Sequence, residues 1–450
     1  MNTFFNHFCS LVTTAALGVA DPRPREKFRQ LAVGLVCAPN PKTITSALEW
    51  LDQRQEDWSA DYRLFSQAHW EAQAVFEPVF HQALASAGVG RERVYTGQDD
   101  TLVRKTGRKI PGVTYARDPL SPPFQVNLVL GQRFVQTSLL LQPGGPEHPW
   151  RALPVSFTHA PTPKPPKGAD PRALAAFKEV RKKHRLSVVA LEQLHFCRQQ
   201  LDRQPGGGQR WLMDVVDGGY ANRTFFRGLP ERTDAVARVR KDAKFRAYLP
   251  PDQRQGARKY GPDQPTPLAS LRDPNLPWHT GQVFVAGQIR ALQYKEVTPL
   301  CWPKVTQTRP VRLILIKAPG YRLRQGGKLL YREPAFLLTT DLTTPAAELI
   351  AAYLARWEVE VNFRDEKTLL GVGQAQVRNP QAVVRAPAFL VACYSMLLWS
   401  SICVFGDRRT GAFDTLPAWR HTEPARPSTR DLIRLMQRQA TDVFMNPLRN

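Results

Sequence analysis

The spacing of apolar and polar residues divides the chain into regions of different character. Up to about Arg93, apolar residues recur at helical spacing, as in TITSALEWLDQ and AQAVFEPVFHQALASAG, and this predicts helices. From Val94 the pattern changes to short extended runs, among them RVYTGQDDT, FQVNLVLG and QRFVQTSLLLQP. The last two runs flank Gly131, as the strands of a β-hairpin would. We therefore expect a helical N-terminal region followed by strands.

The middle of the chain combines helix, strand and loop patterns. Residues 158–171, THAPTPKPPKGADP, indicate a linker or surface loop. A long basic helix, ALAAFKEVRKKHRLSVVALEQLHFCRQQL, is predicted next, and then a buried strand, RWLMDVVD, broken by Gly218 and Gly219. A short helix and the strand AVARVRK follow. From Phe245 to Asp341 the sequence is rich in Pro, Arg and short β runs, which predicts a β-rich insertion.

The last part of the chain predicts two helices. Thr344 and Pro345 form a helix start, with Pro at the first helical position and Glu348 in the first turn. One helix should run from there to Gly371. The segment from Ala386 to Phe405 is uncharged and mostly apolar, so it is long enough to cross a bilayer. The centre of a large soluble domain has the same character, and we expect a buried helix.

The chain is strongly basic, which bears on its partner. Its 450 residues are enough for about three domains, and 62 Lys and Arg against 39 Asp and Glu give a net charge of +23. An enzyme of small metabolites has little need of this excess, whereas a protein that neutralises a phosphate backbone does. Nucleic acid is therefore the expected partner, the alternative being a basic but merely solvated surface.

Targeting signals point to the cytoplasm. The six cysteines are scattered, without a CxxC pair, which predicts free thiols in a reducing compartment. The apolar N-terminus resembles a signal peptide, but it carries no Lys or Arg before Arg23. We expect a cytoplasmic protein without membrane attachment.

Acidic residues stand at the ends of predicted strands. Asp217 closes the run WLMDVVD on the side of Met213 and Val215, and a carboxylate there is costly unless it is paired or bound to metal. The alternative is that Asp217 caps the next helix. Asp214 falls mid-strand and is the weaker candidate. Asp99 and Asp100 would face opposite sides of their strand, and the local pattern does not decide between them. Strands, a helix, a strand and a late helix with these acids follow the order of a ribonuclease-H-like α/β fold.

The late helix contains the sharpest pattern. Tyr353, Arg356, Glu360 and Lys367 fall within an arc of ~60° at 100° per residue. Ile350, Leu354, Trp357 and Val361 form an adjoining arc, which this helix should bury. The polar stripe should therefore lie at the edge of the core. The alternative is a surface ladder of ion pairs, such as Arg356 with Glu360.

This stripe resembles a known family. Its pattern, Y-(2)-R-(3)-E-(6)-K, is similar to the signature of the large insertion-sequence transposase superfamily named for those four residues. The runs DDTLVRKTGRKIPG and DGGYANRTFFRGLP, followed by RVRKDA, resemble the regions around that family's first and second aspartates. The resemblance extends from about Asp99 to Lys367 and includes the β-rich insertion. In that family the aspartate directly before Thr is the ligand, which favours Asp100 over Asp99.

The resemblance implies a DNA transposase with a ribonuclease-H-like catalytic core. Asp100, Asp217 and Glu360 would be its catalytic acids and would hold two Mg²⁺ ions, for which Mn²⁺ is expected to substitute. Tyr353, Arg356 and Lys367 would contact phosphates near the cut end. The further backbone contacts that we expect are Lys105, Lys109, Arg238, Arg240 and Lys241. Trp278 and Trp302 are candidates for stacking on a flipped base, although a core position is the alternative for each.

The patterns and the resemblance together predict the organisation of the protein. The segments are a helical N-terminal DNA-binding domain (1–93), the first part of the catalytic core (94–244), the β-rich insertion (245–341), the second part of the core (342–407) and a C-terminal tail (408–450). The partners would be double-stranded DNA, at element ends and at the target, and a second copy in a homodimer. The alternatives are a nuclease or resolvase of the same fold, and a domesticated, non-cutting DNA-binding protein.

Overall fold

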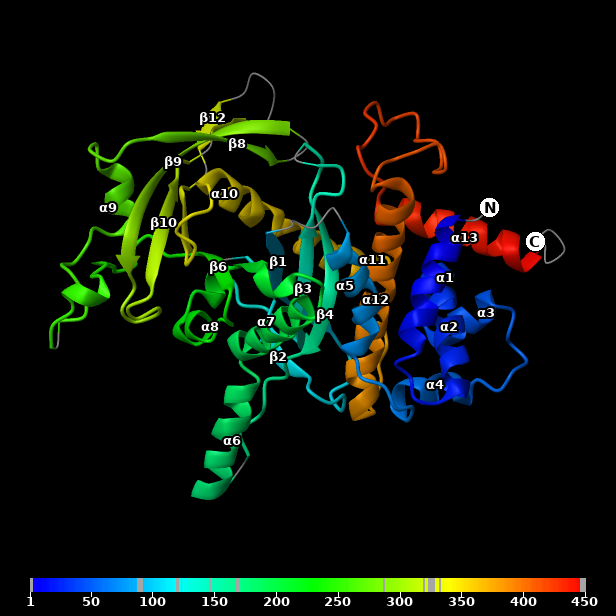
Figure 1. Cartoon of the computed structure of the whole chain (residues 1–450). Helices are drawn as coiled ribbons and strands as arrows, with labels where there is room; N and C mark the ends of the chain where they lie inside the picture. The colour runs from blue at the N-terminus through cyan, green and yellow to red at the C-terminus, as the bar shows by residue number, and fades with distance from the viewer. Residues whose placement is uncertain are drawn as a thin grey trace. The chain divides into compact units, whose positions relative to one another are not determined.

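The computed structural model describes residues 3–86, 92–118, 121–122, 124–145, 147–166, 168, 170–256, 258–285, 288–318, 320–322, 328–331 and 333–445. It divides the chain into two compact units, neither of them continuous in sequence (Figure 1). Unit 1 comprises Met1–Val89, Asp99–Val189 and Glu358–Asn450. Unit 2 comprises Gly90–Gln98 and Ala190–Trp357.

Unit 1 combines a helical layer with antiparallel strands. Its helices are α1 (Thr3–Ala16), α2 (Pro22–Cys37), α3 (Ile44–Trp50), α4 (Ser59–Ser66), η1 (Ala74–Phe76), α5 (Glu77–Ala85), α6 (Pro171–Lys183), α11 (Trp357–Thr368), α12 (Pro380–Phe405) and α13 (Thr429–Met445). Its strands are β2 (Thr114–Arg117), β3 (Leu128–Leu141), β4 (Arg151–His159) and the second half of β1 (Arg93–Arg104). β3 pairs antiparallel with both β2 and β4. The predicted N-terminal helices are thus present.

The apolar helix α12 is the centre of unit 1. It packs on β4 and on the N-terminal helices α1, α2, α4 and α5, and Phe389 meets Phe28 and Phe65 edge to face, with ring centroids 4.7 and 5.3 Å apart. By length and composition it is the one described helix that could cross a membrane, but 78% of its most apolar window is buried inside the protein. The expected buried helix is confirmed, and membrane association is not indicated.

Unit 2 is built on a mixed sheet. The first half of β1 pairs parallel with β5 (Trp211–Val216), and β5 pairs parallel with β6 (Thr233–Arg238). Antiparallel neighbours continue the sheet: β13 (Ala335–Thr339), β10 (Pro310–Ile316), β9 (Gln288–Cys301), β8 (His279–Val285) and β7 (Arg246–Ala247). The small pair β11 (Gly320–Arg322) and β12 (Leu329–Tyr331) is separate.

Short helices complete unit 2. They are η2 (Gly207–Gln209), η3 (Gly218–Tyr220), α8 (Arg223–Arg227), η4 (Pro251–Gln253), α9 (Pro267–Arg272) and α10 (Ala346–Ala355), while α7 (Leu186–Asp202) begins in unit 1 and continues into unit 2. Met213 of β5 and Leu337 of β13 pack with Leu349 and Ile350 of α10 in one apolar cluster. α10 therefore covers one face of this sheet. The large mixed sheet and its helices confirm the α/β class.

Three details differ from the sequence prediction. Gly131 lies inside the continuous strand β3 rather than in a hairpin turn. The residue is Gly because a Cβ there would come within 2.7 Å of the Val103 carbonyl oxygen of the neighbouring strand β1. The predicted long basic helix is broken between α6 and α7. The late helix is broken at Arg356, and Trp357, predicted to be buried, is 61% exposed.

Candidate functional site

Asp217 stands directly after β5, at the end of the parallel strands of unit 2. It is exposed and precedes η3, yet its side chain makes no capping hydrogen bond to that turn. Gly218 lies against the end of β6, where a Cβ would be 3.2 Å from the carbonyl oxygen of Arg238. The alternative role of Asp217 as a helix cap is therefore not supported, and its exposed carboxylate can contact a ligand.

Tyr353 lies within electrostatic reach of Arg356, Asp217 and Arg238, all of them in unit 2. The pKa of the Tyr353 hydroxyl is raised, mainly by burial and also by the negative charge of Asp217. The positive charges of Arg356 and Arg238 act in the opposite direction and lower this pKa. The Arg356 guanidinium lies 6.0 Å from the centre of the Tyr353 ring. Unit 2 therefore brings together four of the predicted residues: Asp217, Arg238, Tyr353 and Arg356.

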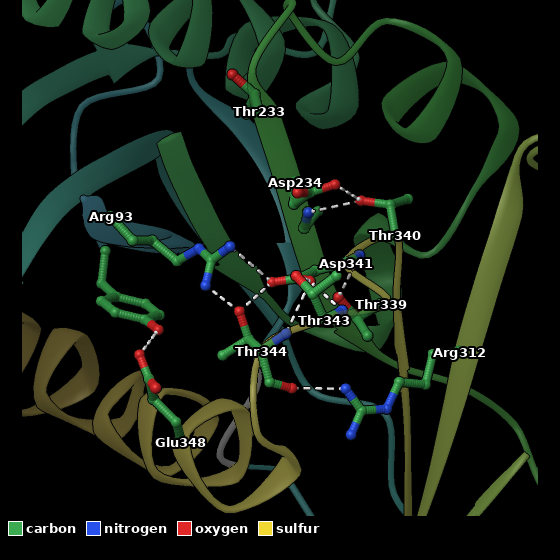
Figure 2. Close-up of polar contacts among 12 residues, drawn as sticks. Arg93, Thr233, Asp234, Arg312, Thr339, Thr340, Asp341, Thr343, Thr344 and Glu348 are labelled. Atoms are coloured by element: carbon green, nitrogen blue, oxygen red, sulfur yellow. Dashed lines mark hydrogen bonds and ion pairs between the residues drawn. The ribbon is translucent and has the colours of Figure 1, made fainter. Parts of the chain in front are cut away.

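A polar network fixes the start of α10, the helix that carries Tyr353 (Figure 2). Asp341 forms an ion pair of 3.0 Å with Arg93 and accepts backbone N–H bonds from Thr343 and Thr344 at 2.7 and 3.1 Å. Although burial alone would raise the pKa of Asp341, the hydrogen bonds from Thr344 and Thr343 and the charge of Arg93 hold it below its usual value. Arg312 donates to the Thr344 carbonyl at 2.6 Å. A buried, charge-assisted network of this kind holds the helix start in one position.

Beside Asp217, unit 2 contains a basic cavity of about 1070 Å³. Two of its arginines are paired with acids, Arg240 with Asp242 at 2.9 Å and Arg246 with Asp263 at 2.8 Å. The other cations in its lining are Arg238, Lys241, Lys244, Arg272 and Lys304. Lys244, Arg246, Arg272 and Lys304 were not predicted, although the density of Lys and Arg in RVRKDAKFR signalled the first two.

The two tryptophan candidates have different surroundings. Trp302 lines the basic cavity, with its ring 5.5 Å from that of Phe245. Trp278 is 42% exposed and lies under the ammonium groups of Lys295 and Lys317, which are 4.7 and 5.4 Å from its ring centre. Neither tryptophan is a fully buried core residue.

Asp99 and Asp100 lie in the part of β1 that belongs to unit 1. The Asp100 carboxylate forms an ion pair of 3.2 Å with Arg133 of β3. One oxygen of Asp99 accepts the backbone N–H of Asp100 at 2.8 Å. Arg133 was not predicted, and no local sequence signal marks it.

The two aspartates point to opposite faces of β1. Thr96 donates to Asp214 at 2.7 Å and Gln98 donates to the Ala190 carbonyl of α7 at 3.0 Å, so the even positions face α7. Tyr95 instead donates to Glu348 of α10. Alternation along β1 puts Asp99 on the odd-numbered side of the strand and Asp100 on the even-numbered side. In β5, Met213 packs against α10, so Asp217 shares the α10 side as well. The last pair of the β1–β5 ladder is Gln98 with Val216.

The other two residues of the stripe are on α11, in unit 1. Glu360 and Lys367 are half-buried. Burial lowers the pKa of Lys367, the adjacent Glu366 raises it and Arg104 lowers it. Glu366 is fully buried beside Gln136, and burial raises the pKa of this carboxyl to about 8. Lys367 is therefore a partly desolvated cation, which interacts more strongly with an anion than a fully hydrated one does.

One predicted DNA contact requires a correction. Lys105 is buried, and its ammonium group donates to the carbonyl oxygens of Gly373 and Ala375 at 2.9 and 2.7 Å. It therefore stabilises the segment after α11 and does not face a ligand. Lys109, by contrast, is exposed.

Among the residues that the structure describes, no three His, Cys, Asp or Glu side chains are gathered so that they could hold a metal ion. The candidate acids are instead distributed over the two units, with Asp99, Asp100 and Glu360 in unit 1 and Asp217 in unit 2. Their carboxylates are the hard oxygen donors that Mg²⁺ prefers. The donor chemistry fits a divalent ion.

An acid after a parallel strand, with a basic cavity beside it, is compatible with an α/β protein that acts on phosphodiesters. A comparison with protein families supports this class: residues 17–298 match the family described as DDE superfamily endonuclease. The match covers more than half of the chain, and the chain belongs to this family. A search of curated proteins finds no match.

The family match confirms the resemblance to a DDE transposase-type protein. It includes Asp99, Asp100 and Asp217 and ends before α10. Membership implies an enzyme of the nuclease or transposase type with DNA as its substrate, and such endonucleases generally use divalent metal ions. The four-residue signature on α10 and α11 lies outside the match.

Proposed function

We propose that this protein is a DNA transposase that binds the ends of a mobile element, cuts them and joins the 3′ ends to target DNA. The observation that carries the proposal is that the charges of Asp217 and Arg356 both act on the Tyr353 hydroxyl, in a chain of the DDE endonuclease family. A carboxylate next to arginine and tyrosine is the arrangement expected where a phosphodiester meets a metal-binding acid. We also propose a ribonuclease-H-like core, interrupted by an insertion at residues 245–341.

Asp217, Glu360 and one aspartate of the Asp99–Asp100 pair are proposed as the carboxylate ligands. Two Mg²⁺ ions, or Mn²⁺ in their place, would activate the attacking oxygen and stabilise the leaving oxygen. The family resemblance favours Asp100 as the first acid. Alternation puts the two aspartates on opposite sides of β1, and Asp100 is paired with Arg133 at 3.2 Å, so Asp99 is kept as the alternative.

The remaining residues of the site would bind and orient DNA. Arg356 offers a planar fork that fits two phosphate oxygens, and Lys367 offers a single point charge. Tyr353 would donate its hydroxyl proton to a phosphate oxygen, since its raised pKa keeps that hydroxyl protonated. A proposed homodimer would hold both element ends, and a cytoplasmic location gives access to the nucleoid.

The basic cavity is proposed as part of the DNA-binding surface. Arg238, Arg240 and Lys241 line it, together with cations from two other segments. Their combined charge suits a phosphate backbone. Trp302 presents an aromatic face in the same cavity, so it is the better of the two base-stacking candidates.

The test is to neutralise two acids without changing their shape. Asp217→Asn and Glu360→Gln should each abolish cutting of a labelled DNA fragment that carries the element ends, while gel-shift binding persists. There are two matched controls. Asp252→Asn changes an exposed acid of unit 2. Glu358→Gln changes an acid on the same helix as Glu360, whose carboxylate pairs with Arg426 at 2.6 Å. Both controls should cut normally.

Two results would contradict the proposal. Normal cutting by the double variant would show that these acids do not hold the catalytic ions. Cutting by the wild type without any joined product would make the protein a nuclease rather than a transposase.

A further inference from the structure

Helix α6 has no buried residue. Leu174 and Val180 are 41% and 46% exposed, and only Ala173 and Phe177 are partly covered. In Figure 1, α6 extends away from the strands of its own unit. An isolated helix of this length is marginally stable in water. What stabilises α6 is therefore local, or else comes from a partner.

The local stabilisation of α6 is clear at both ends. Asp170 accepts the backbone N–H of Ala173 at 2.8 Å, and Pro171 occupies the first helical position, which are both favourable helix starts. Arg181, Lys182 and Lys183 in the last turn complement the helix dipole. These contributions explain why the helix forms, but they do not explain why Lys178, Arg181 and Lys182 share one side of it.

Three cations nevertheless form a stripe. At 100° per residue, Lys178, Arg181 and Lys182 fall within an arc of about 100°, here named the α6 stripe. All three residues are exposed. The single acid of the helix, Glu179, reaches Lys182 only at 4.0 Å, with both side chains more than half exposed. Such a pair contributes little, so the stripe keeps its positive charge.

The stripe faces away from the covered side of the helix. On the same helical geometry, the partly buried Ala173 and Phe177 lie about 110° from the centre of the stripe. The other two cations of the helix, Arg172 and Lys183, lie on its other sides. A rigid rod that presents three neighbouring cations on one flank can lie against a surface of evenly spaced negative charges. Double-stranded DNA is such a surface, with one charge per ~1.7 Å of helix axis.

We propose that the α6 stripe binds the phosphate backbone of double-stranded DNA, without reading the base sequence, as an accessory contact of unit 1. The proposal rests on the DNA-directed function inferred above. It commits to DNA rather than to a second protein copy, because the stripe carries three cations with one weakly paired acid beside it. Long flexible side chains around a polyanion form point contacts that fix no base identity.

The test measures the salt dependence of DNA binding. In the triple variant Lys178→Gln, Arg181→Gln and Lys182→Gln, three phosphate contacts would be lost. The slope of log K against log salt concentration should then become shallower by about 2.7, since each contact contributes about 0.9. Binding would be followed by fluorescence anisotropy on duplex DNA between about 50 and 200 mM salt.

Two control variants separate position from charge. Exchanging Lys and Arg within the stripe keeps the charge and should keep the wild-type slope. The second control removes three exposed arginines that lie at i, i+4 and i+8 on α13: Arg430→Gln, Arg434→Gln and Arg438→Gln. It has the same net charge as the α6 variant and should show a slope near that of the wild type.

The outcomes separate this proposal from the proposed function. At low salt and saturating DNA, the α6 variant should cut as the wild type does, because the stripe holds none of the proposed catalytic residues. An unchanged slope would overturn the role of α6 and leave the transposase proposal standing. Equal reductions in both triple variants would also overturn it, since net charge would then be the cause. A lower helix content by circular dichroism with an unchanged slope would show that the stripe only stabilises its own helix. A loss of self-association with an unchanged slope would identify α6 as a contact between copies.

Discussion

The choice between Asp99 and Asp100 is the sharpest test of the strand geometry. Asp99→Asn and Asp100→Asn are neighbouring substitutions of the same size and the same change in charge. If the odd-numbered side of β1 carries the metal ligand, Asp99→Asn should abolish cutting and Asp100→Asn should preserve it. The family resemblance, which favours the aspartate before Thr101, predicts the reverse.

The two substitutions should differ in the size of their effects. The Arg133 and Asp100 side chains of this ion pair are 38% and 25% exposed, so its loss should cost at most about 1 kcal/mol of folding stability. Removal of an anionic ligand from a metal site forfeits several kcal/mol of transition-state stabilisation. A loss of about 4 kcal/mol corresponds to a roughly thousandfold slower reaction. The two effects differ enough to be separated by a single rate measurement.

The assay is single-turnover cutting of a DNA fragment carrying the element ends, with urea denaturation to measure stability. Asp99→Asn should cut about a thousand times more slowly at unchanged stability. Asp100→Asn should remain within a few-fold of the wild type. Normal cutting by Asp99→Asn, together with a collapse in Asp100→Asn, would refute the alternation argument and support the assignment from family resemblance.

Three further predictions concern buried charge and the polar stripe. Arg151 and Asp407 form a fully buried ion pair with contacts of 3.0 and 2.6 Å. Asp407→Asn should therefore lower the free energy of unfolding, measured by urea titration, by about 3–5 kcal/mol. A loss below about 1 kcal/mol would contradict this. Burial raises the pKa of Asp214 to about 7 from 3.8. Between about pH 4 and 7 the folded state therefore binds a proton that the unfolded state has lost, so the free energy of unfolding should fall as pH rises. Asp214→Asn should flatten that slope in thermal unfolding measured across pH. Arg356→Ala and Lys367→Ala should slow cutting and joining at unchanged melting temperature, and wild-type rates in both would indicate a surface ion-pair ladder.

The sequence predicted the elements whose pattern is set locally. The helical N-terminal region and the α/β class follow from apolar spacing. The burial of α12 follows from a helix apolar on every side with no charge between Ala386 and Phe405. In these segments the local pattern and the final environment agree.

The errors arose where tertiary contacts decide. Gly131 resembles a turn residue in sequence, but its role is the close approach to Val103. Trp357 has the spacing of a core residue, yet the helix breaks at Arg356 and leaves the ring exposed. In sequence, Lys105 resembles a surface cation. In the structure its ammonium group donates hydrogen bonds to the carbonyl oxygens of Gly373 and Ala375, which lie far along the chain. No local pattern contains such long-range partners.

The placement of α12 also constrains how the protein is made. α1 buries Phe4 and Phe8, and α1 packs against α12, where Phe4 lies 5.7 Å from Phe405 by ring centroids. At roughly 5–20 residues per second, synthesis takes roughly 20 to 80 s to pass from the first of these phenylalanines to the last. Throughout this interval the N-terminal helices lack the partner that covers them, and exposed apolar surface of this kind attracts chaperones or aggregates. Unit 1 can complete its core only when nearly the whole chain has left the ribosome, so a message truncated before α12 should yield a product that is degraded rather than a competing DNA-binding fragment.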